Sequence, residues 1–240
     1  MSDPVFLFVH GSCHGAWCWR GVLPAMRARG VEARALDLPS HGDDSTPYAE
    51  VTLAHYRNAI LADIDAHGGA PVVLVGHSAG GYPISAVADT APEKVTHLAY
   101  VCAYVPRDGL SLADMRRRAK RQLILDAIKK TDDGLAFTFL PDKVEDALYG
   151  DCPHVLDFAL PRLTPQAIAP QEQPLPLGPS YASVPRSYVI CDEDRVIPPE
   201  YQAAMTHDWP AGSVRHLPSS HSPFFSMPER LADLLIAGAT

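Results

Sequence analysis

The fold is decided by residues 72–81, which read VVLVGHSAGG. Val72 to Val75 form a short apolar run typical of a buried strand. The Gly-x-Ser-x-Gly motif follows directly, and the pattern from Ala79 to about Asp89 predicts a helix after it. A strand, this motif and a helix in that order indicate a sharp turn that lifts a nucleophilic serine, Ser78, above the end of a sheet.

The glycines on either side of Ser78 have a steric reason. A strained turn brings backbone close to Gly76 and Gly80 and leaves no room for a Cβ atom at either position. The turn also places Ser78 at the N-terminus of the helix, where the helix dipole favours developing negative charge. We therefore predict that Ser78 is a catalytic nucleophile.

The alternation of strand and helix extends outward in both directions. Predicted strands cover residues 5–9, 31–36, 72–75, 95–102, 186–191 and 214–216, and predicted helices cover 17–29, 52–67, 79–89, 199–207 and 228–237. A parallel sheet covered by helices requires this alternation. The sequence therefore predicts an α/β fold whose mostly parallel sheet has about six strands flanked by helices.

One part of the chain breaks this pattern. No strand is clear between residues 106 and 185, and eight of the 23 prolines fall between Pro141 and Pro179. Proline cannot donate a hydrogen bond to a sheet, so we expect short helices and fixed turns here. The predicted organisation is a core of residues 1–105 and 185–240, interrupted once by a helical lid of residues 106–184.

Composition excludes several classes of protein. The 240 residues are 47% hydrophobic, which suffices for one sizeable core, and the net charge of −8 argues against a nucleic-acid partner. No apolar run reaches the ~20 residues of a membrane span, and no signal-peptide pattern stands at the N-terminus. We expect a cytoplasmic protein that acts on a small molecule, and we leave its oligomeric state open, with a homodimer as one alternative.

Two groups of residues have both a structural and a functional interpretation. The basic run from Arg116 to Arg121 fits a solvated helix face, and its functional alternative is attraction of an anion beside a site. A metal site at His10, Cys13 and His14 lacks a carboxylate or second cysteine at ligand spacing. We therefore expect no metal here, and we expect His10 to brace its loop by hydrogen bonding.

A serine hydroxyl needs a base that removes its proton, so a histidine must lie within hydrogen-bond reach of Ser78. His221 lies in a loop between the last predicted strand and the last helix, near the edge where the carboxyl ends of the strands converge. His216, on that strand, is the alternative base. His77 is adjacent to Ser78 and points elsewhere, so we expect a structural role for it.

The base in turn needs a carboxylate that orients it and stabilises its charged form. Three acids stand directly after the strand predicted at residues 186–191, and they are Asp192, Glu193 and Asp194. All three lie between the serine and the candidate histidines in the chain. The order serine, acid, histidine is the order of α/β hydrolases, and this order alone leaves the choice among the three acids open.

A tetrahedral intermediate also needs hydrogen-bond donors where its oxyanion develops. One should be the backbone N–H of Ala79, directly after the nucleophile. The other should come from the loop after the first strand, residues 10–15, where the amide of Ser12 is best placed. This chemistry requires neither a metal ion nor a cofactor.

Three stretches of the chain resemble a known family: residues 10–17, HGSCHGAW, residues 76–81, GHSAGG, and residues 191–198, CDEDRVIP. They are similar to the plant methyl esterase and hydroxynitrile lyase branch of the α/β hydrolases. Residues 217–230, LPSSHSPFFSMPER, resemble bacterial pyrethroid-hydrolase-type carboxylesterases more closely still. The resemblance covers the core and is thin between residues 106 and 185.

This resemblance implies the α/β-hydrolase fold and a specific set of catalytic residues. By position it implies a triad of Ser78, Asp194 and His221, because Asp194 stands four residues before the proline that ends the third stretch. It also implies that the N–H groups of Ser12 and Ala79 form the oxyanion hole.

Two departures separate the branches of the family. The lyases carry a threonine where this chain has Gly11, and a lysine directly after the catalytic histidine, where this chain has Ser222. That lysine stabilises the leaving cyanide, so its absence favours hydrolysis. We predict a serine carboxylesterase for small to medium hydrophobic esters, with a carbon–carbon lyase and a non-enzymatic small-molecule receptor as alternatives.

The predicted lid should set substrate choice, because the triad fixes the reaction and not the shape of the pocket. Each candidate pocket residue is also an ordinary core residue. The candidates are Gly11, Trp17 and Tyr82 near the catalytic loops, and Phe137, Phe139, Leu140, Leu148, Tyr149, Phe158 and Leu160 in the lid.

Overall fold

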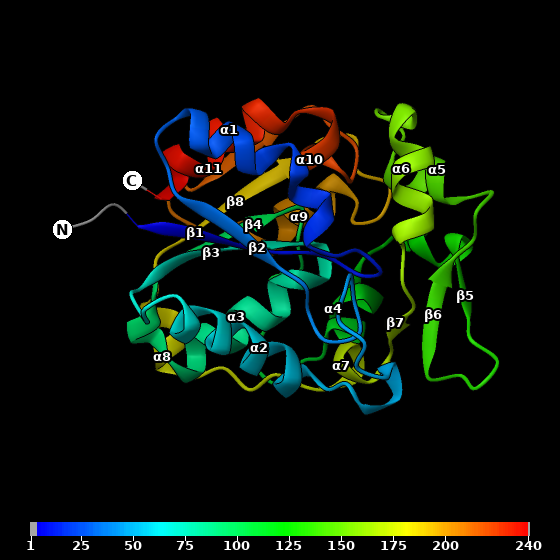
Figure 1. Cartoon of the computed structure of the whole chain (residues 1–240), viewed down its shortest axis with the longest axis horizontal. Coiled ribbons are helices and arrows are strands. Elements are labelled where there is room, and N and C mark those ends of the chain that lie inside the picture. The colour runs from blue at the N-terminus through cyan, green and yellow to red at the C-terminus, as the bar shows by residue number, and fades with distance from the viewer. Residues whose placement is uncertain (1–3, 240) are drawn as a thin grey trace.

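A six-stranded sheet forms the centre of the computed structural model, which describes residues 4–239. Its strand order is β2-β1-β3-β4-β8-β9, and every neighbouring pair is parallel, as predicted (Figure 1). The strands are β1 (Val5–Val9), β2 (Ala33–Leu36), β3 (Val72–His77), β4 (Val95–Val101), β8 (Arg186–Cys191) and β9 (Val214–Leu217).

Helices cover both faces of this sheet. Figure 1 shows α1 and α11 on one face and α2, α3 and α8 on the other, the layers of an α/β fold. The helices outside the β4–β8 connection are α1 (Val22–Ala28), α2 (Leu53–Ala66), α3 (Gly81–Thr90), α9 (Pro199–Met205), α10 (Pro223–Ser226) and α11 (Pro228–Ala239).

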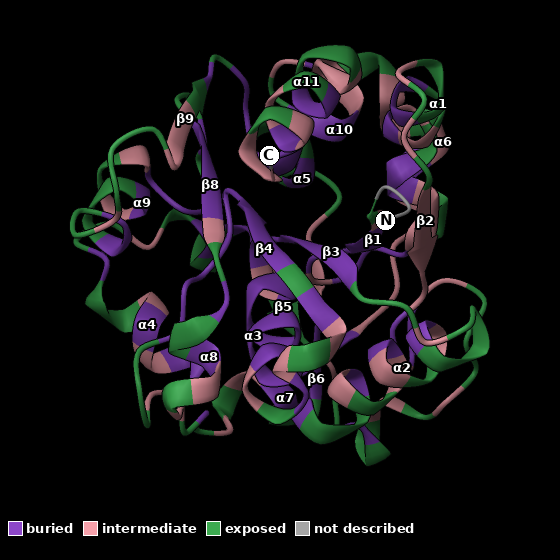
Figure 2. Ribbon diagram, turned by 90° about the vertical axis from the view of Figure 1, so that its left-hand side faces the viewer, coloured by how far each residue is buried: buried purple, intermediate pink, exposed green. Residues whose placement is uncertain are grey.

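The hydrophobic core is divided by the sheet into two clusters, because side chains alternate along each strand. Leu7 and Val9 of β1 face the cluster under α2 and α3, while Phe6 and Phe8 face the cluster under α1 and α11. Figure 2 shows buried residues along β3, β4 and β8, with exposed residues on the outer surfaces of the helices. None of the helices within residues 4–239 has the length and apolar character needed to cross a membrane.

Local signals account for several boundaries. The Thr52 hydroxyl accepts a hydrogen bond from the backbone N–H of His55 at 3.3 Å, and caps α2 as predicted. The strand predicted at residues 186–191 coincides with β8. The helix predicted over residues 17–29 is divided, since Ala16–Arg20 form a 3-10 helix before α1.

The connection between β4 and β8 contains short helices and a second, three-stranded antiparallel sheet. Our expectation that this segment has no strand is therefore wrong. Its prolines gather after residue 140, and the stretch before them forms a hairpin whose turn includes Gly134 at φ +72°. The elements are α4 (Leu112–Arg118), β5 (Ile128–Lys130), β6 (Ala136–Phe139), α5 (Val144–Leu148), α6 (Leu156–Ala159), β7 (Gln166–Ala167), α7 (Ala169–Glu172) and α8 (Pro179–Ser183).

Candidate active site

Ser78 lies at the turn between β3 and α3 with φ +53°, in the left-handed region that residues with a Cβ atom rarely adopt. A Cβ atom on Gly76 would lie 2.7 Å from the carbonyl oxygen of Gly80. A Cβ atom on Gly80 would lie 2.7 Å from the carbonyl oxygen of His10. Both glycines are thus required by close backbone approach, and together they permit the strained turn that raises Ser78.

A continuous chain of hydrogen bonds joins Ser78, His221 and Asp194. His221 Nε2 lies 3.0 Å from Ser78 Oγ, and His221 Nδ1 lies 2.8 Å from Asp194 Oδ2. All three residues are buried. Since a carboxylate only accepts, Nδ1–H donates to Asp194, and Nε2 is left to accept the proton of the Ser78 hydroxyl.

Asp194 is held by hydrogen bonds to both of its oxygen atoms. Oδ1 accepts from the backbone N–H of Val196 at 2.6 Å and of Ile197 at 3.0 Å. Oδ2 accepts from Gln202 Nε2 at 2.9 Å as well as from His221. The carboxylate is therefore fixed in orientation with respect to the imidazole.

The alternative base and acids lie elsewhere. His216 on β9 is exposed, and its Nδ1 lies 2.7 Å from Asp192 Oδ1 at the protein surface. Glu193 is also exposed. The structure therefore brings His221 and Asp194, rather than these candidates, to Ser78.

His77 supports the loop that carries His221. Its Nε2–H donates to the backbone carbonyl of His221 at 2.8 Å. Burial, and after it the nearby imidazoles of His221 and His14, hold the pKa of His77 well below its ordinary value. The ring is therefore neutral, and it has the structural position expected from the sequence.

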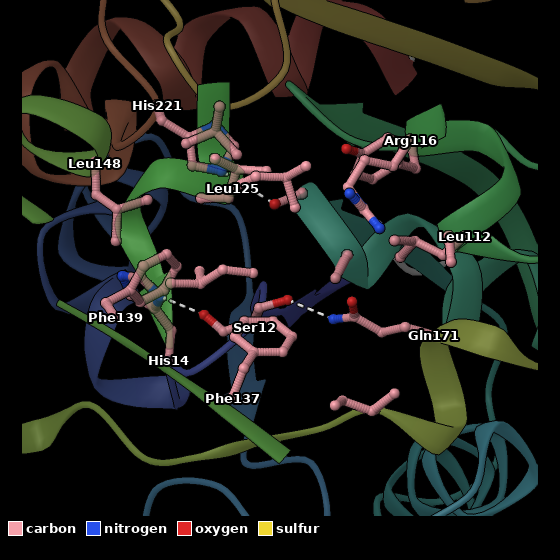
Figure 3. A pocket seen from close by; sticks show the side chains of 18 of the residues that line it. Ser12, His14, Leu112, Arg116, Leu125, Phe137, Phe139, Leu148, Gln171 and His221 are labelled. Carbon is pink, nitrogen blue, oxygen red and sulfur yellow. Dashed lines mark hydrogen bonds between the residues drawn. The ribbon is translucent and has the colours of Figure 1, made fainter. Parts of the chain in front are cut away.

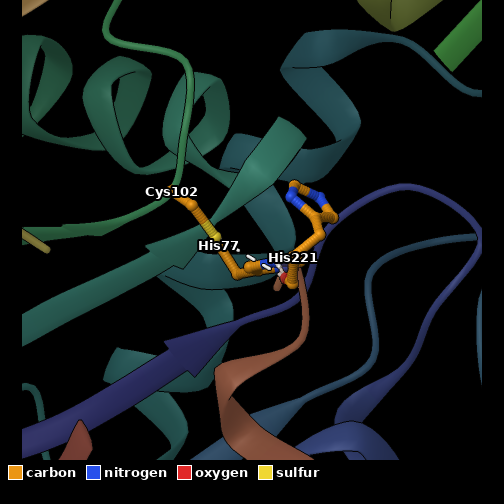
Figure 4. A group of neighbouring side chains, drawn as sticks. All are labelled: His77, Cys102 and His221. Carbon is orange, nitrogen blue, oxygen red and sulfur yellow. Dashed lines mark hydrogen bonds between the residues drawn. The ribbon is translucent and has the colours of Figure 1, made fainter. Parts of the chain in front are cut away.

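Cys102 completes a buried group with His77 and His221, in which one potential metal ligand from each residue lies within 4.8 Å of the others (Figure 4). Both ring nitrogens of His221 are already engaged by Asp194 and Ser78. Nε2 of His77 faces a carbonyl oxygen. Cys102 Sγ lies 3.6 Å from the same carbonyl oxygen, so these ligand atoms serve hydrogen bonds of the site.

The loop after β1 is braced by its histidines. His10 Nδ1–H donates to the carbonyl of Gly11 at 2.8 Å, and Nε2 accepts from the N–H of Leu38 at 3.1 Å. His14 Nδ1–H donates to the carbonyl of Ser12 at 2.9 Å. These bonds occupy both ring nitrogens of His10 and one of His14, and they fix the peptide of Ser12.

A cavity of about 270 Å³ opens over the Ser78 hydroxyl. Figure 3 shows Ser12 between His14 and Gln171, and Gln171 Nε2 donates to Ser12 Oγ at 2.8 Å. The cavity is lined by Ser12, His14, His77, Ser78, Ala79, Tyr104, Leu112, Ala113, Arg116, Arg117, Ile124, Leu125, Ile128, Lys130, Phe137, Phe139, Leu148, Ile168, Gln171, Glu172, Val196 and His221.

Some of the predicted pocket residues line this cavity, and others lie outside its wall. Phe137, Phe139 and Leu148 line the cavity. Gly11 and Tyr82 line a smaller adjacent space. The structure places the other candidates outside the wall: Trp17 and Phe158 pack against Phe225, Tyr149 donates to His14, and Leu140 and Leu160 are partly buried.

The family of the chain follows from comparison with known proteins. A model described as "Alpha/beta hydrolase family" matches residues 6–234. The chain belongs to this family. Among other α/β hydrolases, it is 31% identical to Methylesterase 2 of Arabidopsis thaliana, over 97% of this chain and 94% of that protein.

Bacterial α/β hydrolases are similar to the chain to the same degree. The Pyrethroid hydrolase of Sphingobium wenxiniae is 32% identical over 98% of this chain and 87% of its own. The crystal structure of a pyrethroid hydrolase from Sphingobium faniae JZ-2 matches with a TM-score of 0.87 at 29% identity, covering 98% of this chain and 97% of that one. The resemblance predicted from the motifs is confirmed.

Several residues of this α/β hydrolase site were missed from the sequence. Gln202 binds the acid, and Gln171 binds Ser12. Arg116 contributes a cation to the cavity wall. Of these residues, only Arg116 belongs to a pattern that is visible in the sequence, the basic run. The interpretation we preferred for that run is a solvated helix face.

Proposed function

We propose that this α/β hydrolase is a serine carboxylesterase for small to medium hydrophobic esters, with Ser78, His221 and Asp194 as its triad. The observation that carries the proposal is the unbroken hydrogen-bond chain among these side chains beside a mostly apolar cavity. The enzyme class, a carboxylic ester hydrolase, follows from the methylesterases and the pyrethroid hydrolase among its relatives.

In the first half of the reaction, His221 Nε2 accepts the proton of Ser78 Oγ while Oγ attacks the ester carbonyl carbon. The carbonyl oxygen becomes an oxyanion and accepts hydrogen bonds from the N–H groups of Ser12 and Ala79. Asp194 accepts from His221 Nδ1–H throughout and stabilises the imidazolium. Collapse of the intermediate breaks the bond to the alkoxide, which takes the proton from His221 and departs as the alcohol.

Water completes the cycle by attacking the acyl group on Ser78. His221 takes a proton from the water as its oxygen bonds to the acyl carbon, and the same two N–H groups bind the second oxyanion. The bond to Ser78 Oγ then breaks, Oγ regains a proton from His221, and the carboxylic acid leaves.

The cavity supports the substrate range and a role for the β4–β8 connection. Residues of this connection, among them Phe137, Phe139 and Ile168, supply most of the wall. We propose that residues 106–184 act as a lid that selects the substrate. A volume of about 270 Å³ suits a small to medium ester.

Ester hydrolysis fits the site better than carbon–carbon lysis. A Cβ atom on Gly11 would lie 2.8 Å from both His77 Nδ1 and Ser78 Cβ, so the threonine of the lyases has no room. Ser222, at the position of the lyase lysine, is fully buried. Incubation with mandelonitrile should therefore release neither benzaldehyde nor cyanide above the uncatalysed rate, and release by the wild type would favour the lyase.

The proposed function is tested by Ser78→Ala with p-nitrophenyl acetate as substrate. The variant should lose turnover, while Ser183→Ala, an exposed serine on α8, should retain it. Circular dichroism checks that both variants fold. Retained turnover in folded Ser78→Ala would overturn the triad, and a wild type with no turnover on any ester would favour a receptor.

A further inference from the structure

Helix α4 brings to the catalytic cavity a guanidinium group that the proposed hydrolysis does not use. Arg116 lines the cavity and is half-buried. Its Nη1 donates to Oε1 of Gln122 at 3.0 Å, and within residues 4–239 the group forms no ion pair. Figure 3 shows its nitrogen atoms directed toward the space that the labelled side chains surround.

The other charged residues of the wall leave this cation uncompensated. Arg117 is paired with Asp114, with Nη1 2.9 Å from Oδ1. Lys130 adds a second positive charge at the exposed side of the wall, and Glu172, also exposed, forms no ion pair with Arg116. The cavity wall is therefore cationic although the whole protein carries a net charge of −8.

The charge of Arg116 acts on the part of the cavity next to the nucleophile. Tyr104 lines the cavity, and its backbone N–H donates to the carbonyl of Ser78 at 3.1 Å. Burial raises the pKa of the Tyr104 phenol, and the positive charge of Arg116 opposes that rise. Arg116 and Ser78 therefore face one shared space.

A cation in a mostly apolar cavity is costly to desolvate unless an anion pairs with it. A guanidinium presents several N–H donors in a planar fork, and only one of its bonds here is taken by Gln122. Carboxylates match this fork with two parallel hydrogen bonds. A substrate carboxylate would thus accept hydrogen bonds from the N–H groups of Arg116 that Gln122 does not engage.

We propose that Arg116 anchors an anion subsite in the catalytic cavity, so that the preferred substrate is an ester that also carries a carboxylate remote from the scissile bond. The proposal rests on the esterase function above and narrows its substrate class. The apolar wall around Phe137 and Phe139 takes the hydrocarbon chain, and Arg116 binds the carboxylate. The carboxylate can belong to the acyl part or to the alcohol part of the ester, and the experiment includes one pair of substrates for each case.

The experiment compares kcat/KM for two pairs of esters in which a neutral amide replaces the carboxylate. Monomethyl adipate is paired with methyl adipamate for the acyl part, and 4-acetoxybutanoate with 4-acetoxybutanamide for the alcohol part. In at least one pair the wild type should prefer the carboxylate about tenfold to a hundredfold, the range of a charge-assisted hydrogen bond. Arg116→Gln should abolish that preference, and Arg116→Lys should retain part of it.

Arg118→Gln is the matched control, because Arg118 is exposed on the same helix and does not line the cavity. It should keep the wild-type preference. A measurement that needs no variant is the salt dependence: raising NaCl from about 0.02 to about 0.5 M should reduce the preference of the wild type, because salt screens the pairing of charges.

A wild type that turns over both neutral esters but does not prefer either carboxylate overturns the anion subsite and leaves the esterase function standing. The subsite is also overturned if Arg116→Gln keeps the full preference. A wild type that hydrolyses none of the four esters, nor p-nitrophenyl acetate, overturns the esterase function itself. These outcomes separate the two proposals.

Discussion

The carboxylate of Asp151 accepts hydrogen bonds from both the hydroxyl and the backbone N–H of Ser220, the latter at 3.0 Å. Ser220 directly precedes His221, the proposed base. Asp151 belongs to the connection between β4 and β8, so this contact ties the proposed lid to the catalytic loop. We infer that Asp151 is a positioning residue that acts through Ser220.

We expect Asp151→Ala to lower kcat about tenfold and to leave KM nearly unchanged, because His221 loses alignment while the cavity wall is kept. Asp151→Asn keeps one acceptor oxygen and should recover most of the activity. Steady-state kinetics with p-nitrophenyl acetate separate the two constants. A loss confined to KM, or one that Asp151→Asn does not recover, contradicts a positioning role.

Acid should destabilise the fold through the buried His14. Burial lowers the pKa of His14 from its ordinary value of 6.5 to about 4. Between these values the unfolded chain binds a proton that the folded chain does not, so the free energy of unfolding falls as the pH drops from 6.5 to 4. One such group contributes about 1.4 kcal/mol per pH unit within that window.

Urea unfolding at a series of pH values measures this dependence. His14→Gln removes one of the titrating groups and should make the decline between pH 6.5 and 4 less steep, whereas His154→Gln, at an exposed position, should leave it unchanged. Equal slopes for wild type and His14→Gln would show that His14 does not contribute.

Gly11→Ala should reduce kcat/KM for p-nitrophenyl acetate about tenfold or more. The added Cβ atom would lie 2.8 Å from Ser78 Cβ and from His77 Nδ1, so the nucleophile or its neighbour must shift. Gly150→Ala is the control, since the nearest atom to its Cβ lies 3.6 Å away. Full activity in Gly11→Ala contradicts the close approach of these residues.

Phe139→Ala should shift the substrate preference toward esters with longer acyl chains. Removing the ring enlarges the cavity at the place where Phe139 contacts Phe137. The ratio of kcat/KM for p-nitrophenyl octanoate to that for the acetate should rise about tenfold. Leu160→Ala, partly buried outside the lining, is the control. An unchanged ratio would show that Phe139 does not contact the acyl chain of the substrate.

The sequence predicted the features whose causes are local. Gly76 and Gly80 identify the turn at Ser78 because only glycine fits there. The loops with Asp194 and His221 each follow a strand of the central sheet, and a parallel sheet brings the ends of its strands to one edge. Chain order and strand placement therefore sufficed to predict which loops lie near Ser78, whereas the choice of Asp194 among three acids depended on the family resemblance.

Features that depend on contacts between residues far apart in the chain could not be predicted from the sequence. Asp151 and Ser220 lie 69 residues apart and share no pattern. Trp17 and Phe158 could not be told from pocket residues, because aromatic side chains suit a core and a cavity equally well. Which side of α4 faces the cavity, and hence that Arg116 lines it, depends on packing rather than on composition.

The most direct test of the central claim, that His221 activates Ser78 as the nucleophile, is the reaction of the whole chain with a fluorophosphonate, followed by intact mass and peptide mapping. We predict one adduct, mapped to Ser78, that is absent in Ser78→Ala and forms at least about a hundredfold more slowly in His221→Ala. An adduct at another residue, or equal labelling of His221→Ala, would contradict the account.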